Sequence, residues 1–422
     1  MKHWLSKLAS LLPPIFFSLL IFLIPTNLFL KLGESQAYIN GLLVDYLIPK
    51  LYLSDLILLG LLISLALSEN FIWPKTISLK KLKQNWLIIL LLITLIIRQF
   101  YTPFPLAALE FGLHLLAAIL LLATYVQKKI GWRPLVNWIL LLTLIFQSLL
   151  GLYQFLVQKS LAGYWLLGEP DFNRYLVLNR GLIFGSEKIL PYGTTAHPNV
   201  LAGVIVVFWL ILWRGLSNQT SKQLLLKTFF WLTTPLILFI LFLTQSVTAW
   251  LSLVLGISWL SLQSRQLSIR LKNWLVGKLI LIFLLLCPIL LLTLAQQFPQ
   301  NPSVQRRANL IQASWQMVQK NPIWGVGFNQ FTAVLEKYNI QTEIIRFVQP
   351  VHHLGLLGLA EGGLLLACLL TVILIKLKRN KKFTAAFLTS LIILLPIISL
   401  DHYLLTLQTG RLLWVFLIAS LV

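Results

Sequence analysis

The chain has 422 residues, of which 58% are hydrophobic and only 11% are charged, and its mean hydropathy is +0.85. A soluble protein of this length cannot hide so much apolar surface. The composition therefore excludes a soluble globular protein and indicates a polytopic membrane protein. The 34 Lys and Arg exceed the 12 Asp and Glu and give a net charge of +22.

Apolar runs of membrane-spanning length follow one another along the whole chain, and they predict about twelve transmembrane helices. The last run is short, and 228–263 is compatible either with one long hairpin or with two helices. No hydrophilic stretch is long enough for a separate soluble domain, so the expected fold is an all-α polytopic membrane protein with residues 1–422 in a single transmembrane domain. The runs centre on residues 14–31, 52–68, 86–100, 105–126, 136–157, 198–214, 228–245, 248–263, 279–296, 351–376, 384–400 and 411–422.

The basic residues are concentrated at the N-terminus and in every second connection between these runs. These segments hold 21 of the 34 Lys and Arg against the single acid Glu69, a balance of +20, whereas the remaining segments have 13 bases and 11 acids, a balance of +2. Because Lys and Arg are retained in cytoplasmic loops, both termini are predicted to be cytoplasmic. Nucleic acid is therefore not an expected partner. The retention of Lys and Arg on the cytoplasmic side of the membrane accounts for the positive net charge.

Two connections on the opposite, extracytoplasmic side are long, at about 158–197 and 297–350, and long ordered loops are usually functional. The loop 297–350 contains a predicted amphipathic helix at 303–319, which can lie along the membrane surface. Arg306 and Arg307 lie near its N-terminal end. Arginine is suited to phosphate groups because its planar guanidinium donates hydrogen bonds in pairs and stays charged.

Four of the six histidines fall at predicted extracytoplasmic helix ends, where imidazole can exchange protons near neutral pH. They are His197, His352, His353 and His402, and Asn199, Asp401 and Arg411 lie close to them in the sequence. Asn199 also fits a simple helix cap. Glu361 lies nine residues beyond His352 in an apolar helix, where an ionisable group indicates either a functional site or a polar contact between helices. Glu110 and His114 share a helix face and suggest a buried polar pair.

Three sequence blocks in the second half of the chain resemble the O-antigen ligase and O-antigen polymerase superfamily of bacterial membrane glycosyltransferases. The first runs from Arg307 through an amphipathic helix to the turn NPIWGVGF. The second is PVHHLGLLGLAEGG, and the third is the GTTAHPN block that ends at Asn199. The tail DHYLLTLQTGRLLW is similar to one branch of the superfamily, so the resemblance spans about 180–411.

The chain departs from the family pattern at several positions. His353 stands where the family usually has Asn, and Pro191 stands where an Arg often precedes the third block, which leaves Arg180 or Lys188 to serve in its place. A Ser-Arg pair is common at the start of the eighth helix, but here Ser246 is followed by Val247.

The resemblance implies a C-type glycosyltransferase in the bacterial plasma membrane with its active site on the extracytoplasmic side. The donor would be an undecaprenyl-diphosphate-linked glycan, transferred with inversion to a hydroxyl of a glycan, lipid or protein acceptor. In this family register His352 is the general base, and Arg307, Arg306 and Arg180 would bind the diphosphate. The other polar residues of these blocks, His197, Asn199, His353, Glu361, Asp401, His402 and Arg411, would support the site.

We expect no cofactor and no catalytic metal, since the extracytoplasmic carboxylates form no Asp-x-Asp pair for a hard cation. A transporter or lipid flippase is the alternative from another class. It would place ionisable groups near the bilayer midplane in two matching halves, and Glu110, His114 and Glu361 give it some support. No internal repeat is visible in the sequence, and the polar cluster lies on one side of the predicted membrane.

Overall fold

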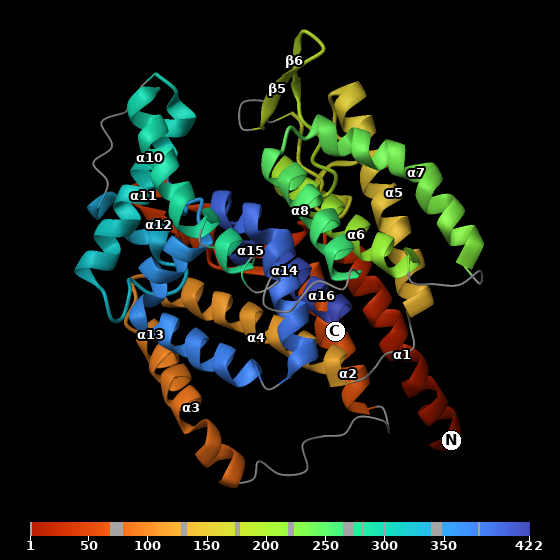
Figure 1. Ribbon diagram of the computed structural model, residues 1–422, viewed down its shortest axis with the longest axis horizontal. Coiled ribbons are helices and arrows are strands. Elements are labelled where there is room, and N and C mark those ends of the chain that lie inside the picture. Colours follow the sequence, from red (N-terminus) through yellow and green to blue (C-terminus); the bar gives the residue numbers. More distant parts are fainter. Residues whose placement is uncertain are drawn as a thin grey trace.

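The computed structural model describes residues 2–67, 79–127, 133–173, 178–217, 223–264, 274, 276–280, 282–298, 300–338, 348–378 and 380–422. Several of the basic connections and parts of the loops 158–197 and 297–350 lie outside these residues. The described chain is mostly helical and forms one assembly of packed helices (Figure 1).

Five long helices lie in the described part of the N-terminal half. The helices are α1 (Lys2–Leu23), α2 (Leu53–Leu67), α3 (Leu79–Gln99), α4 (Pro105–Gln127) and α5 (Arg133–Val157). Between α1 and α2 lie β1 (Phe29–Lys31), η1 (Glu34–Gln36), β2 (Tyr38–Ile39), β3 (Leu42–Leu43), η2 (Asp45–Leu47) and β4 (Lys50–Tyr52). Between α5 and the next helix lie η3 (Gly163–Trp165), β5 (Arg180–Ile183) and β6 (Ser186–Ile189).

The C-terminal half contains α6 (Pro198–Ser217), α7 (Leu224–Leu243), α8 (Val247–Ser264), the π-helical turn η6 (Ile282–Leu286), α10 (Cys287–Gln297) and α11 (Pro302–Lys320). They are followed by α12 (Phe331–Val334), η7 (Leu335–Lys337), α13 (Leu354–Leu377), α14 (Lys381–Leu400), α15 (Tyr403–Thr406) and α16 (Gln408–Leu421).

Seven helices of the described chain are long and apolar enough to cross a membrane, and five further apolar helices have 10 to 17 residues. The seven lie at Pro105–Leu122, Pro134–Val157, Pro198–Ser217, Leu224–Leu243, Val276–Gln297, Leu354–Lys376 and Lys381–Leu400. This arrangement confirms a helical multi-pass membrane protein, while the number of twelve spans stays a prediction. The 228–263 region forms two helices, α7 and α8, because the chain turns at Gln245, which has a positive φ of 54°.

The described chain contains three small two-stranded antiparallel sheets that were not predicted from the apolar pattern. β1 pairs with β4, β2 with β3, and β5 with β6. The expected first helix at 14–31 was wrong at its C-terminal end, because α1 stops at Leu23 and the apolar residues Phe29 and Leu30 pair with Tyr52 and Leu51 instead. Pro25 lacks the backbone N–H that a continuing helix requires.

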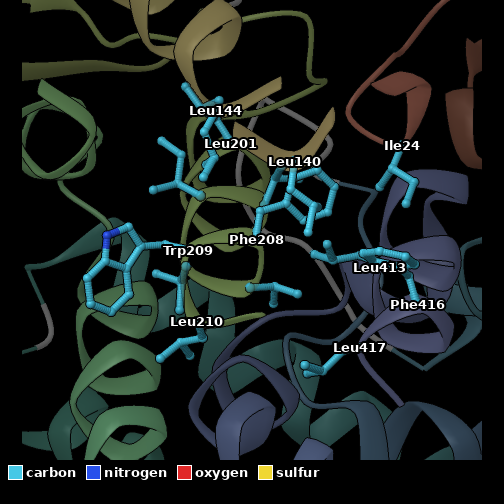
Figure 2. Packing of buried hydrophobic residues seen from close by; sticks show 14 of the residues in the cluster. Ile24, Leu140, Leu144, Leu201, Phe208, Trp209, Leu210, Leu413, Phe416 and Leu417 are labelled. Atoms are coloured by element: carbon cyan, nitrogen blue, oxygen red, sulfur yellow. The ribbon is translucent and has the colours of Figure 1, made fainter. Parts of the chain in front are cut away.

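The core is centred on α6, which is apolar on all sides and is therefore enclosed by protein. Its residues from Val200 to Leu210 are all buried. Phe208 packs edge-on against Phe416 of α16, and Figure 2 shows this pair with Leu413 and Leu417 on one side and Trp209 on the other. Helices α5, α8 and α16 contact α6, so this core fixes the end of α6 that carries the third sequence block.

A second core joins α11 to α12 and α13. The predicted amphipathic helix is confirmed as α11, with Asn301 as its cap: the Asn301 side chain accepts hydrogen bonds from the backbone N–H groups of Ser303 and Val304. Leu310 and Ile311 are buried in this core, so much of the apolar face packs on the protein itself, whereas Trp315 remains exposed.

Candidate active site

The site is built where the chain enters α6 and α13 and where it leaves α14. Each of these helix ends presents a histidine: His197 precedes α6, His352 and His353 precede α13, and His402 follows α14. The structure brings three of them together with Asp401. We call His197, His352, Asp401 and His402 the histidine cluster.

His352 and His402 are in direct contact. Their rings pack edge to face with centroids 4.8 Å apart. His402 Nδ1 lies 2.8 Å from the hydroxyl of Thr406, and Tyr46 packs edge-on against the His402 ring with centroids 5.6 Å apart. These contacts orient the His402 ring, which in turn packs on His352.

The free ring nitrogen of His352 is the most informative atom of the cluster. Its Nδ1 is buried and has no hydrogen-bond partner among the described residues. Buried polar atoms are usually hydrogen-bonded, and an unpaired one requires an explanation such as a functional role or an absent partner. In its unprotonated form this nitrogen can accept a hydrogen bond from a hydroxyl group.

Asp401 connects the two helix ends that carry His197 and His402. Its carboxylate accepts a hydrogen bond from the Asn199 side chain at 3.1 Å and from the backbone N–H of His402 at 2.7 Å. Burial raises the pKa of Asp401, but the positive charge that His402, His352 and His197 carry when protonated, together with the hydrogen bond from the His402 N–H, outweighs burial and holds the pKa below its ordinary value. Asp401 is therefore ionised at neutral pH and faces the histidines with a negative charge.

Burial lowers the pKa of all three histidines of the cluster because a charged imidazolium loses its hydration there. For His352 the negative charge of Asp401 opposes burial, and the charge of Arg307 assists it, with a net lowering of the pKa. For His402 burial and the neighbouring His352 lower the pKa to about 3 despite Asp401. His352 is thus the free base at neutral pH, which is the form that can accept a proton.

His197 holds the entry to α6 in place. Its Nδ1 accepts a hydrogen bond from the backbone N–H of Asn199 at 3.0 Å, and its Nε2 lies 2.5 Å from the side-chain amide nitrogen of Asn179. The alternative of Asn199 as the helix cap is wrong, because His197 makes the capping contact and the Asn199 side chain binds Asp401. Burial lowers the pKa of His197, which agrees with a neutral ring.

His353 points to a different part of the protein from His352. It caps α13 by accepting a hydrogen bond from the Leu356 N–H at 3.1 Å, and its Nε2 lies 3.1 Å from the Leu284 carbonyl. Both histidines precede the helix, and the extended backbone at His353 sends neighbouring side chains to opposite sides. An Asn could make the same capping contact, which explains how this position accommodates either residue.

The arginines occupy three different environments. Arg307 is half-buried on α11, makes no hydrogen bond or ion pair with the described residues, and acts electrostatically on His352. Arg306 precedes it and is also half-buried. Arg180 starts β5 next to Asn179 and lies 3.6 Å from Glu187, while the Lys188 ammonium lies over the Phe155 ring.

Arg411 is buried in α16 and is already engaged. It donates to the backbone carbonyls of Leu405 at 2.7 Å and Thr406 at 3.4 Å, and its guanidinium lies over the Phe111 ring at 4.7 Å. These contacts hold the turn between α15 and α16 and thereby the position of Thr406 beneath His402.

Glu361 lies at a break in α13 rather than in the histidine cluster. Its carboxylate accepts hydrogen bonds from the backbone N–H groups of Asn329 at 2.9 Å and Phe331 at 3.0 Å. The turn GVGF fits into the break: Val326 N–H donates to the Ala360 carbonyl and Gly327 N–H to the Glu361 carbonyl. The second sequence block therefore ties the α11–α12 connection to the helix that begins at His352.

Sequence reasoning missed two residues that orient the cluster. Tyr46 packs on His402 and Asn179 contacts His197, and neither belongs to a block with recognisable spacing. Among the described residues no group of three His, Cys, Asp or Glu side chains has an arrangement that could hold a metal ion.

Comparison with known proteins gives a family match that covers the first and second sequence blocks but not the third. Residues 232–371 match the family described as O-antigen ligase. This range runs from α7 into α13 and contains Arg307, His352 and Glu361, while His197 and Asp401 lie outside it. The match confirms the resemblance to the O-antigen ligase superfamily, a class of membrane glycosyltransferase. No curated protein matches the chain.

Proposed function

We propose that the protein is an inverting, metal-independent glycosyltransferase of the plasma membrane that uses an undecaprenyl-diphosphate-linked glycan at the outer face of the membrane. The observation that carries the proposal is the buried Nδ1 of His352, which has no hydrogen-bond partner in the described part of the chain, beside the ionised Asp401. The family match over residues 232–371 supports the reaction class.

In the proposed reaction the acceptor hydroxyl donates a hydrogen bond to His352, which removes its proton as the oxygen attacks the anomeric carbon. The bond between that carbon and the diphosphate oxygen breaks, and its electron pair stays on the diphosphate. His352 becomes an imidazolium, and the negative charge of Asp401 stabilises it. The proton then leaves to solvent or to the diphosphate, which restores the base.

Arg307 is the proposed partner of the leaving diphosphate. It is the arginine whose charge acts on His352, and a guanidinium that makes no ion pair with the described protein residues is available for a phosphate group. Arg306 and Arg180 are proposed to assist it. Positive charge directed at the leaving group stabilises the transition state more than the ground state.

The experiment that tests this function uses purified protein in lipid nanodiscs with a radiolabelled undecaprenyl-diphosphate glycan. We expect release of undecaprenyl diphosphate together with a new glycan product whose anomeric configuration is inverted, and both should persist in the presence of EDTA. Arg307→Ala should abolish release, and Arg307→Lys should restore it only in part, since lysine lacks the paired donors of the guanidinium.

The matched control is Lys320→Ala, which removes an exposed cation from the other end of the same helix. Normal turnover in Arg307→Ala would remove Arg307 from the diphosphate site. Transport of the intact lipid-linked glycan without cleavage would contradict the proposed reaction and favour the flippase alternative.

A further inference from the structure

An apolar groove lies between α2 and α4. Its volume is about 640 Å³, within the range of pockets that bind ligands. Leucines from both helices line it, and most of them are about half exposed: Leu56, Leu59 and Leu62 of α2 and Leu106, Leu109 and Leu113 of α4. In a membrane-spanning helix pair, such a groove fits a hydrocarbon chain.

One end of the groove lies close to the histidine cluster. Lys50 lines this end and is paired with Asp45 at 2.6 Å, and Tyr46, the next residue in the chain after Asp45, packs against His402. The 3-10 turn at Asp45–Leu47 therefore lies between the groove and His402. A molecule whose hydrocarbon chain occupied the groove would place its headgroup at this turn, next to the residues that pack on His402.

The charges along the groove argue against a diphosphate at this end. Asp55 and Glu110 line the groove and hold the His114 ring between them, at 2.8 Å and 2.9 Å. The one Lys or Arg among the described lining residues is Lys50, whose charge is balanced by Asp45. Asp55 already accepts hydrogen bonds from the Tyr52 N–H and the Gln408 side chain, so a sugar hydroxyl here would donate to the Glu110 carboxylate, which would repel a diphosphate.

Arg307 lies on a separate part of the site. Its helix α11 packs against α10 and α13, and α4 packs against α16 and α2. The proposed diphosphate position and the groove thus reach the histidine cluster from different helices, as a reaction between two lipid-anchored molecules requires.

We propose that the α2–α4 groove binds the hydrocarbon chain of a lipid-anchored acceptor whose sugar headgroup is uncharged. This inference rests on the proposed function and deepens it, because it makes the acceptor a membrane glycolipid. The fit of the hydrocarbon chain in the groove determines which acceptor is used. The end of the groove at Lys50 positions the sugar hydroxyl toward His352.

Photolabelling in nanodiscs measures binding of lipid probes to the groove without glycan transfer, and it is carried out in the His352→Ala protein. The probes are an alkyl glucoside and a prenyl diphosphate of similar chain length, each with a diazirine in the chain, and a phospholipid with the same diazirine. We expect the glucoside to label peptides of α2 and α4, and the other two probes to label these peptides weakly. Excess unlabelled alkyl glucoside should remove the labelling.

Leu59→Trp and Leu109→Trp fill the groove and should abolish labelling of α2 and α4 by the glucoside. Ile63→Trp and Leu116→Trp add the same side chain at exposed positions of the same helices outside the groove and should leave the labelling intact. Labelling of α2 and α4 in the protein that keeps Leu59 and Leu109 gives a result that does not depend on the folding of any groove variant.

Stronger labelling of α2 and α4 by the prenyl diphosphate would assign the groove to the donor and overturn the proposal. Equal labelling by the phospholipid would show that ordinary bilayer lipid fills it and would also overturn it. Because none of the probes is a lipid-linked glycan donor, no transfer can occur, and these results are independent of whether His352 is the base.

Discussion

At the scale of single residues, the charge of Asp401 affects the pH range in which His352 is neutral and can accept a proton. Burial lowers the pKa of His352 and the Asp401 carboxylate partly opposes this effect. A base with a lowered pKa stays neutral below pH 6.5, so activity should persist into mildly acidic solution and fall only as the pH drops through the lowered pKa.

Asp401→Asn should move the acidic limb of kcat/KM to lower pH by about one unit or more, because it removes the charge that favours the imidazolium. The rate at neutral pH should also fall, since the imidazolium formed during transfer loses its counter-charge. A pH–rate profile measures both effects, with the exposed Asp171→Asn as control. An acidic limb that stayed in place or moved to higher pH would mean that Asp401 does not act on the titrating group.

At the scale of elements, the break in α13 explains why a glycine follows Glu361 by two residues. Gly363 has φ 60° and ψ −161°, a conformation that side chains rarely adopt, and a Cβ there would lie 2.4 Å from the Ile323 carbonyl oxygen. Broken helices are tolerated at membrane depth where other protein groups satisfy the freed backbone. Here Leu364 and Leu365 donate to the carbonyls of Pro322 and Ile323.

Gly363→Ala should therefore destabilise the protein by about 1–3 kcal/mol or more, measured as a lower Tm in detergent. Gly358→Ala is the matched control on the same helix. A Cβ at Gly358 meets no atom closer than 3.7 Å, so the change should be neutral or stabilising by up to about 1 kcal/mol. Equal melting temperatures for both variants would show that the helix break does not constrain the fold.

Local patterns predicted the helices well but could not predict contacts between distant segments. The amphipathic repeat of α11 and the Pro at the start of α6 were sufficient to find those elements. The helix end at Leu23 was missed because the following apolar residues form a strand whose partner begins at Lys50. Tyr46 and Asn179 were missed for the same reason: nothing in their neighbourhoods indicates the histidine that each contacts.

The candidate site was predicted in part. The blocks around His197, His352 and Asp401 were recognisable from sequence spacing, and the structure brings these residues together. The separate positions of Glu361 at the helix break and Arg411 beneath α15 depend on backbone partners, which sequence spacing does not reveal.

At the scale of the whole molecule, the distribution of Lys and Arg predicts which end of the helix assembly faces the cytoplasm. Gln300 lies between α10 and α11, and Lys381 starts α14; both are exposed. In a variant without Cys287 and Cys368, a cysteine at Gln300 should react with an impermeant maleimide added outside intact cells, and a cysteine at Lys381 should react only after permeabilisation. The reverse pattern would place the histidine cluster inside the cell.

The central claim is that His352, and not its neighbour His353, removes the proton from the acceptor. The most direct measurement is the transfer rate of His352→Ala and His353→Asn in the same reconstituted assay, with binding of the lipid-linked donor measured alongside. We predict that His352→Ala loses about 10²–10⁴-fold in turnover and keeps donor binding, while His353→Asn stays active because Asn can cap α13. An inactive His353→Asn together with an active His352→Ala would contradict the account.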